Sequence, residues 1–293
     1  MLIAACWSLP GRAASNPLVV AVDGVLCDLT RSLAANQARV VCLVQPGSDP
    51  HQAVLRPEDR RALAEADLVL FNGFNLTPSL LRVPVRGARV AVAEQAVPNN
   101  PGRDPHVWHD PSQAAAMVRV VEMRLAPLLP PQATGGLKQR SQAARALLED
   151  LGRWSTAQFR TVPEQSRVLV SQHRAFASLA RRYGLRELPL LESFTTAGVL
   201  RPSSLAAMSE AIRGSGTRQL FTESPSISKT LRRISRSSGV PVNPTPLVAD
   251  GLAPGLSTVQ TATRTVCTFV NGQGGRCDQA GADQLNQRWA AIR

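Results

Sequence analysis

The sequence predicts an α/β protein with two lobes of similar size joined by a long helix. In both halves of the chain, short apolar strands alternate with helices, a rhythm typical of parallel sheets covered by helices. Between the halves lies a long stretch that has helix-forming residues and no strand pattern. The chain of 293 residues is long enough for each lobe to bury a core.

The first half contains four expected strands, which are short, apolar and rich in β-branched residues. These strands cover residues 17–23, 39–44, 68–71 and 89–93. Helical patterns lie between them at residues 25–36 and 58–66. Because parallel strands need crossover connections, this alternation predicts one parallel sheet with helices on its faces.

The middle of the chain predicts the linking helix. Helix-forming stretches between residues 112 and 159 are separated by Pro130-Pro131 and by Gly135-Gly136, and the stretch at 137–159 has apolar residues at helical spacing. Beyond it, strands are expected at 167–170, 185–191, 219–222 and 240–242, with helices at 175–183, 203–213 and 229–237. We therefore expect a residual signal or tail at 1–16, an N-terminal lobe at 17–133, a linking helix at 134–162 and a C-terminal lobe at 163–293.

The large net positive charge does not by itself indicate a nucleic-acid partner. Lys and Arg number 33 against 21 Asp and Glu, a net charge of +12, but all except Lys138 and Lys229 are arginines scattered along the chain. Nucleic-acid binders gather basic and aromatic residues in one stripe, and no such stripe occurs here. We therefore expect no nucleic-acid partner. No apolar run reaches the length of a transmembrane helix.

The five cysteines favour an exported protein. Cys27 and Cys42 form one local pair, and Cys267 and Cys277 flank a turn-rich segment; neither spacing is a Cys-x-x-Cys zinc or redox motif. The fifth, in Ile3-Ala4-Ala5-Cys6, resembles a lipoprotein cleavage box whose upstream signal would be missing. Two disulfides and one lipidated Cys6 fit this pattern. The alternatives are an ordinary apolar tail and buried free thiols in a cytosolic protein.

Three of the four histidines follow expected strands. His51 and His106 each come after an Asp-Pro pair, and His173 follows the first strand of the second half. Two carboxylates, Glu223 and Asp250, occupy the same kind of position. Open α/β sheets bind ligands beyond the carboxyl ends of their strands, and proline stiffens the two loops. Three imidazoles with one carboxylate make a tetrahedral zinc site, so the sequence predicts a metal centre.

Several motifs carry a resemblance to a known family. They are Gly47-Ser48-Asp49-Pro50-His51 with Pro57-Glu58-Asp59, Ala66-Asp67-Leu68-Val69-Leu70-Phe71-Asn72-Gly73, Asp104-Pro105-His106-Val107-Trp108 with Asp110-Pro111, His173-Arg174-Ala175-Phe176, and Val248-Ala249-Asp250-Gly251-Leu252. In order over residues 17–265, they resemble the zinc-type metal receptors among ABC transporter substrate-binding proteins. The resemblance implies two Rossmann-like lobes, a rigid linking helix and a metal site in the cleft between the lobes. Carried over by position, the metal ligands are His51, His106, His173 and Asp250.

Two departures from the family bear on the metal. The segment 94–103 is short and lacks the histidine-rich loop that zinc-type members often carry. Manganese-type members resemble the chain in layout but have Glu where His173 stands. Because Mn²⁺ favours oxygen-rich sites and a third imidazole favours zinc, we expect Zn²⁺ as the transported ion, with Mn²⁺ as the alternative. His109 is interpreted as a bystander or an outer-shell residue.

The resemblance implies a monomeric zinc receptor, in the periplasm or cell envelope, that delivers its ion to the permease of an ABC importer with a cytoplasmic ATPase. Membrane attachment through Cys6 would suit this role. A zinc hydrolase, with Glu223 or Glu192 as general base, is disfavoured because the chain lacks a His-Glu-x-x-His helix and a fourth ligand would close the site. An adhesin or metal-independent envelope protein on the same fold is a third alternative.

Overall fold

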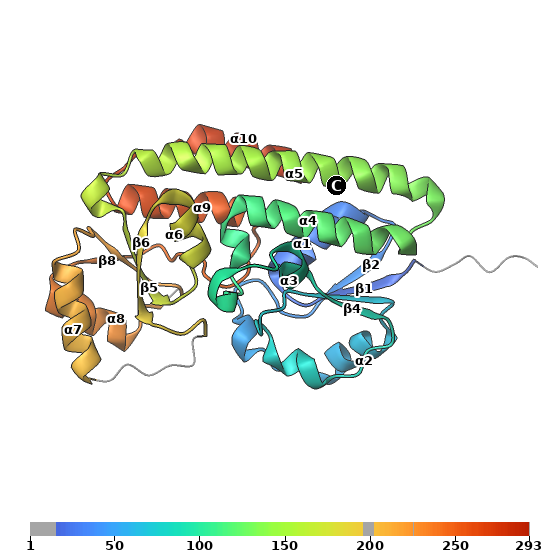
Figure 1. Cartoon of the computed structure of the whole chain (residues 1–293), viewed down its shortest axis with the longest axis horizontal. Helices are drawn as coiled ribbons and strands as arrows, with labels where there is room; N and C mark the ends of the chain where they lie inside the picture. Colours follow the sequence, from blue (N-terminus) through green and yellow to red (C-terminus); the bar gives the residue numbers. More distant parts are fainter. Residues whose placement is uncertain (1–15, 196–201, 225, 293) are drawn as a thin grey trace, which may run out of the picture.

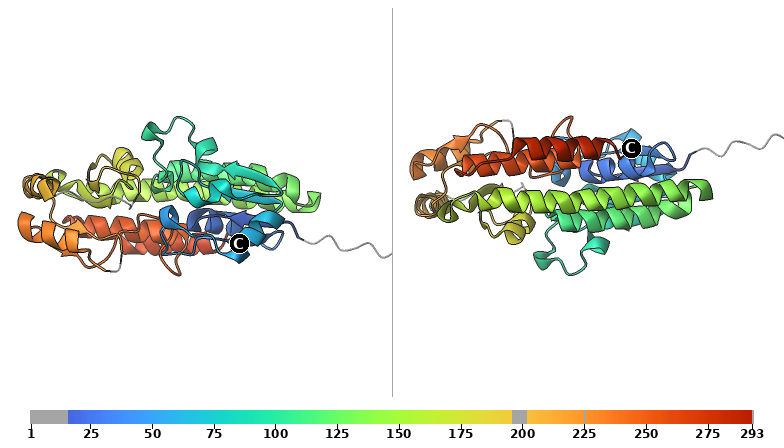
Figure 2. Two further views of the ribbon diagram at one scale, coloured as in Figure 1. Left: turned by 90° about the horizontal axis from the view of Figure 1, so that it is seen from below. Right: turned by 90° about the horizontal axis from the view of Figure 1, so that it is seen from above.

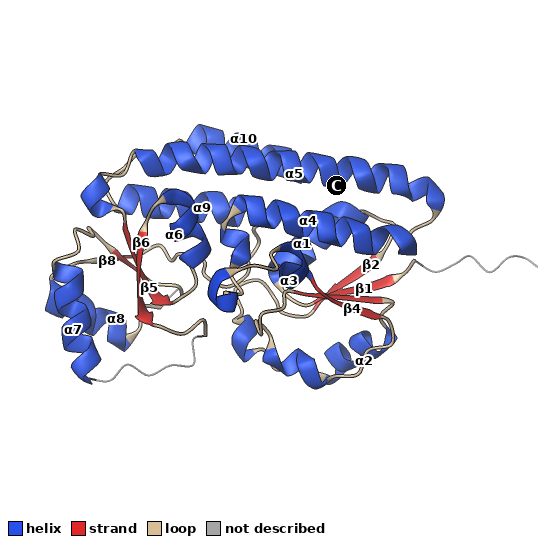
Figure 3. Ribbon diagram, viewed as in Figure 1, coloured by secondary structure: helices blue, strands red, loops and turns tan. Residues whose placement is uncertain are grey.

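A computed structural model describes residues 16–195, 202–224 and 226–292 of the chain. Cys6 and almost all of the expected tail at 1–16 lie outside the described residues. The fold confirms the expected class: two α/β lobes lie side by side, and long helices run across both of them (Figure 1). The sheets lie within the lobes, and helices surround them (Figure 3).

The N-terminal lobe contains one parallel sheet of four strands in the order β2-β1-β3-β4. Its strands are β1 (Leu18–Ala21), β2 (Arg39–Cys42), β3 (Leu68–Phe71) and β4 (Ala88–Ala91). Val20 in the central strand β1 pairs with Val41 on one side and Val69 on the other. The chain runs from β1 to β2 on one side and then crosses back to β3 on the other side of β1, so the strand order reverses between β1 and β3. Open α/β sheets bind ligands at the carboxyl ends of strands that flank such a switch point.

Both faces of this sheet are covered, as the continuous apolar strands predict. The helices are α1 (Gly24–Ala34), α2 (Pro57–Glu65), α3 (Val92–Ala96) and α4 (Pro111–Leu125). Val19 packs into a core with α1 and α4, whereas its neighbour Val20 packs into a second core with Leu63 of α2. Adjacent strand residues thus point to opposite faces, and each face is buried against its own helices.

The C-terminal lobe divides its strands between two parallel pairs, β5 (Val168–His173) with β6 (Arg186–Leu191) and β7 (Leu220–Phe221) with β8 (Val242–Asn243). The buried side chain of Gln273 lies between the pairs, and its amide donates to the carbonyls of Val168 and Gln219 at 3.2 and 3.0 Å. The helices of this lobe are α6 (Ala177–Tyr183), α7 (Pro202–Arg213) and α8 (Lys229–Ser238).

The linking helix α5 (Pro131–Arg160) has 30 residues, a length of about 45 Å. It begins at a proline in the first turn, where the missing N–H costs nothing, and it continues through Gly135-Gly136 rather than stopping there. Each glycine costs only about 1 kcal/mol in a helix, which the long buried face of α5 offsets. The expected separation at this glycine pair was therefore wrong.

Two C-terminal helices, α9 (Thr258–Gly272) and α10 (Gln279–Ala290), were not expected from the sequence. They run alongside α5 from one lobe to the other (Figure 2). Trp289 of α10 shares the first core of the N-terminal lobe, and the carboxylate of Asp28 in α1 accepts from its indole N–H at 3.0 Å. The proposed lobe boundaries at 133 and 163 stay predictions.

Both expected disulfides are present. Cys27 in α1 is bonded to Cys42 at the end of β2, and Cys267 in α9 is bonded to Cys277 ahead of α10. Loops of this size closed by a disulfide contribute roughly 3 kcal/mol to stability. Within the described ranges, no helix combines the length and apolar character needed to cross a bilayer.

Candidate metal centre

The first candidate ligand, His51, lies on a short 3-10 turn (Pro50–Gln52) beyond β2. The preceding Asp49 caps this turn, because its carboxylate accepts from the backbone N–H of His51 at 2.8 Å. The His51 side chain is only 2% exposed. The Asp-Pro pair therefore presents the imidazole through two effects, the fixed proline φ and the aspartate cap.

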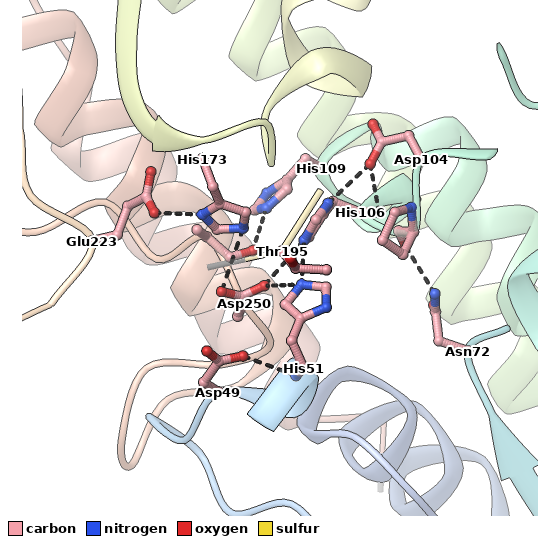
Figure 4. A network of polar contacts seen from close by, with 12 residues as sticks. Asp49, His51, Asn72, Asp104, His106, His109, His173, Thr195, Glu223 and Asp250 are labelled. Carbon is pink, nitrogen blue, oxygen red and sulfur yellow. Dashed lines mark hydrogen bonds and ion pairs between the residues drawn. The ribbon is translucent and has the colours of Figure 1, made fainter. Parts of the chain in front are cut away.

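The second candidate ligand, His106, is oriented by a carboxylate of its own motif (Figure 4). Asp104 Oδ1 accepts from the backbone N–H of His106 at 3.0 Å and from its ring Nδ1 at 2.9 Å. Both residues are fully buried. Because Asp104 accepts from Nδ1, Nε2 is the ring nitrogen that faces the site. Asn72 at the end of β3 donates to the carbonyl of Pro105 at 2.8 Å and fixes the same loop.

The third candidate ligand, His173, is the last residue of β5 rather than a loop residue. Its ring Nδ1 donates to Glu223 Oε2 at 2.7 Å, and Glu223 Oε1 accepts from the backbone N–H of Gln172 at 2.6 Å. Glu223 follows β7, so a neighbouring strand sets the orientation of this imidazole. His173 Nε2 is buried, makes no hydrogen bond with the described residues and lies 3.6 Å from Asp250 Oδ2, so it is the ring nitrogen that faces the cluster.

These three histidines and Asp250 converge on one point (Figure 4). Their four ligand atoms lie within 4.8 Å of one another. Asp250 Oδ1 is 3.0 Å from His106 Nε2 and 3.2 Å from His51 Nε2, and the two Nε2 atoms are 3.2 Å apart. Neighbouring donors of a tetrahedral zinc site lie roughly 3.3 Å apart. His173 Nε2 lies 3.6 Å from the other carboxylate oxygen of Asp250, so the four residues surround a space that suits one metal ion.

Asp250 lies on the segment 244–257, which connects β8 to α9 without helix or strand. Its neighbour Ala249 has a carbonyl that accepts a hydrogen bond from His109 Nε2 at 2.8 Å. His109 thus reaches from the N-terminal lobe to the loop that carries the carboxylate. The sequence left His109 as a bystander or an outer-shell residue and could not identify this contact, because its partner is a backbone atom distant in the sequence.

The carboxylates and imidazoles of the cluster shift one another's pKa values in opposite directions. Burial would raise the pKa of Asp250, but the three imidazoles around it hold that pKa well below its usual range. Burial would lower the pKa of His173, but the carboxylates of Asp250 and Glu223 raise it to about 10. The pKa of His106 is also raised, because Asp104 and Asp250 outweigh its burial.

The fourth histidine behaves in the opposite way. Burial lowers the pKa of His109 to about 4, so its imidazole is neutral near pH 7. With Nε2 donating to a carbonyl, this neutral ring is a hydrogen-bond donor to the loop of Asp250.

A cavity of about 670 Å³ adjoins the site and is lined in part by His173, Glu223 and Asp250. The two glutamates considered as general bases do not serve that role here. Glu223 is engaged by His173, and Glu192 is an exposed partner of Arg174 at 3.1 Å.

Comparisons with known proteins find metal-binding relatives of this chain. The family model "ZnuA: Zinc-uptake complex component A periplasmic" matches residues 19–269. The zinc-binding protein TroA of Treponema pallidum (strain Nichols) is 31% identical over 227 residues, 74% of this chain and 73% of that protein. The manganese-binding lipoprotein MntA of Bacillus subtilis (strain 168) is 29% identical over 188 residues, 60% of this chain and 61% of that protein.

The solved structures show the same architecture. The periplasmic zinc-binding protein TroA from Treponema pallidum superposes with a TM-score of 0.82 at 26% identity, covering 88% of this chain and 99% of that one. Fe(III)-bound YtgA from Chlamydia trachomatis superposes with a TM-score of 0.81 at 22% identity, covering 89% and 99%, and shows the fold alone. The chain therefore belongs to the family of periplasmic zinc-uptake components, metal-binding receptors of ABC importers that carry an ion and are not enzymes.

Proposed function

We propose that the chain captures Zn²⁺ in the periplasm or cell envelope and delivers it to the permease of an ABC importer. The observation that supports this most is the convergence of three imidazole nitrogens and one carboxylate, a donor set that suits tetrahedral Zn²⁺. Two imidazoles come from the N-terminal lobe, and His173 and Asp250 come from the C-terminal lobe. One ion would hold the two lobes together.

The donor set favours zinc over manganese. Mn²⁺ prefers carboxylate, carbonyl and water oxygens in shells of six, whereas three imidazoles with one carboxylate suit tetrahedral Zn²⁺. Relatives of the chain are named for zinc or for manganese, so family membership alone leaves this choice open. A manganese receptor is the second candidate function, favoured by the likeness to the manganese-binding lipoprotein MntA.

Substrate-binding proteins of ABC importers work with a membrane permease and an ATPase. All four proposed ligands come from a single chain, so the site is complete in a monomer. Lipid attachment through Cys6 would hold such a receptor at the membrane. A lipid-anchored monomer is the form that we propose for the working protein.

A competitive metal titration of the chelator-stripped protein tests the choice of ion. We expect one Zn²⁺ per chain, bound at least about 100-fold more tightly than Mn²⁺. The matched variant His173→Glu replaces the third imidazole with an oxygen ligand and is expected to shift the preference toward Mn²⁺. Equal affinities for the two ions in the native chain would contradict the zinc assignment, and the absence of tight binding to either ion would contradict the receptor function.

A further inference from the structure

The loop that carries Asp250 must place a ligand accurately without belonging to a helix or strand. Apart from the contacts of the Asp250 carboxylate with the histidines, four hydrogen bonds among the described residues tether the stretch 247–253 to the rest of the protein. They run from Leu247 N to Thr222 O, from Gly47 N to Leu252 O, from Ala253 N to Thr261 Oγ1, and from His109 Nε2 to Ala249 O. Only the last one holds the residue directly next to Asp250, and it comes from the opposite lobe.

The His109 ring is itself held firmly. It packs against Phe176 with ring centroids 4.7 Å apart and against Trp108 at 5.5 Å. His109 ends the 3-10 turn Val107–His109, which directly follows the ligand His106. A short, stiff segment therefore connects one proposed ligand to the contact that holds another.

Packing alone does not explain a histidine at this position. A phenylalanine would fill the same space between Trp108 and Phe176, but it would leave the carbonyl of Ala249 without this donor. That carbonyl oxygen can only accept, so Nε2 must carry the proton in this contact. The specific contribution of the imidazole is the N–H group that it directs at the opposite lobe.

We propose that His109 is a positioning residue, whose hydrogen bond to the Ala249 carbonyl keeps the Asp250 carboxylate within reach of the three imidazoles. The contact closes the C-terminal lobe onto the ion and slows its release. This inference rests on the proposed metal-receptor function for its effect on the ion. Its structural half, the tethering of residues 248–253, holds for the metal-free chain as well.

Two variants separate the hydrogen bond from the ring. His109→Phe keeps the aromatic packing and loses the donor, whereas His109→Gln keeps an N–H donor at a similar reach. With the zinc-loaded proteins and an excess of a fluorescent chelator, we expect zinc to dissociate about 10-fold faster from His109→Phe than from the native chain. His109→Gln is expected to stay within about threefold of native. An unchanged rate in His109→Phe, or equal acceleration in both variants, would overturn the proposal.

Hydrogen exchange of the metal-free proteins supplies a readout that needs no ion. Backbone amides of residues 248–253 are expected to exchange faster in His109→Phe than in the native chain and in His109→Gln. Identical exchange in all three proteins would overturn the tether even if zinc binds as proposed. Faster exchange in His109→Phe would support it even if titration of the native chain contradicted the zinc assignment.

Discussion

The two halves of the metal centre are built in different ways. In the N-terminal lobe, an aspartate two residues earlier accepts from the backbone N–H of both His51 and His106, and Asp104 also accepts from the ring of His106. In the C-terminal lobe, His173 ends a strand and is oriented by Glu223, which is 50 residues away in the sequence. Asp250 lies on an irregular loop that a histidine of the other lobe holds.

This difference shows where the site depends on local sequence and where it depends on the fold. The motif Asp104-Pro105-His106 brings its own orienting carboxylate, so it can present its imidazole wherever the loop is placed. The C-terminal ligands need their neighbours to be brought together first. We therefore expect the C-terminal half to be the more sensitive to changes in residues that do not touch the ion.

Loss of a ligand from the C-terminal half of the site should lower zinc affinity the most. His173→Ala removes one of four donors and leaves Glu223 without its imidazole partner, so zinc affinity should fall by about 10³-fold. Competition with a fluorescent chelator measures this change, and Arg174→Ala is a neighbouring control that should bind like the native chain. Zinc affinity within threefold of native in His173→Ala would refute the ligand assignment.

The carboxylate that orients His173 is expected to come next. In Glu223→Gln only one of the two side-chain atoms can accept, so either His173 Nδ1 or the Gln172 N–H faces an amide donor. Zinc affinity should fall by about 10–100-fold. The exposed Glu192→Gln serves as the control in the same titration, and similar affinities for the two variants would contradict the role given to Glu223.

Asp23 is a buried carboxylate without an imidazole partner, and its pKa is shifted in the opposite direction to that of Asp250. Asp23 follows β1 and caps α1, and its burial raises its pKa to about 6, whereas the histidines lower the pKa of Asp250. The folded protein therefore binds this proton more tightly than the unfolded chain does. The contribution of Asp23 to the free energy of unfolding should therefore fall as pH rises from about 4 to about 6.

Asp23→Asn keeps the cap and removes this charge, so it should stabilise the protein by about 2 kcal/mol at pH 7.5 and by much less below pH 4. Urea unfolding at the two pH values measures the difference. Asp278→Asn, at the exposed N-terminus of α10, is the matched cap control and should show no such gain. A gain of equal size at both pH values would argue against the buried charge as its source.

The smallest effect is expected in the N-terminal half of the site, where Asp104 orients His106 within one motif. In Asp104→Asn the amide oxygen can still accept from both the backbone and the ring of His106, and the amide N–H₂ can donate to the hydroxyl of Ser178. Zinc affinity should therefore change by only about threefold. A loss as large as that of Glu223→Gln would mean that the charge of Asp104, rather than its geometry, orients the ligand.

Most of the fold was predictable because strand and helix periodicity are local. The strands around Val20 and Val69 and the long helix followed from short apolar runs and helical spacing. The helices α9 and α10 were missed because they are rich in Thr, Gln and Asn, and their burial comes from packing along α5. The two pairs of C-terminal strands are bridged by the side chain of Gln273 through long-range hydrogen bonds, which no local sequence pattern shows.

The candidate site divides in the same way. The motifs indicated His51, His106, His173 and Asp250, and the structure brings all four together. The sequence marked Glu223 as a strand-end carboxylate but did not identify it as the partner of His173, because that pairing depends on the order of strands in space. The contact of His109 with Ala249 depends on the packing of one lobe against the other.

A crystal structure of the zinc-loaded chain, with anomalous diffraction at the zinc edge, tests the central claim most directly. We expect one strong anomalous peak, which lies between the two lobes. It should be coordinated at about 2.0–2.2 Å by Nε2 of His51, His106 and His173 and by the carboxylate of Asp250. A peak elsewhere, or an ion at this point whose shell lacks His173 or Asp250, would contradict the account.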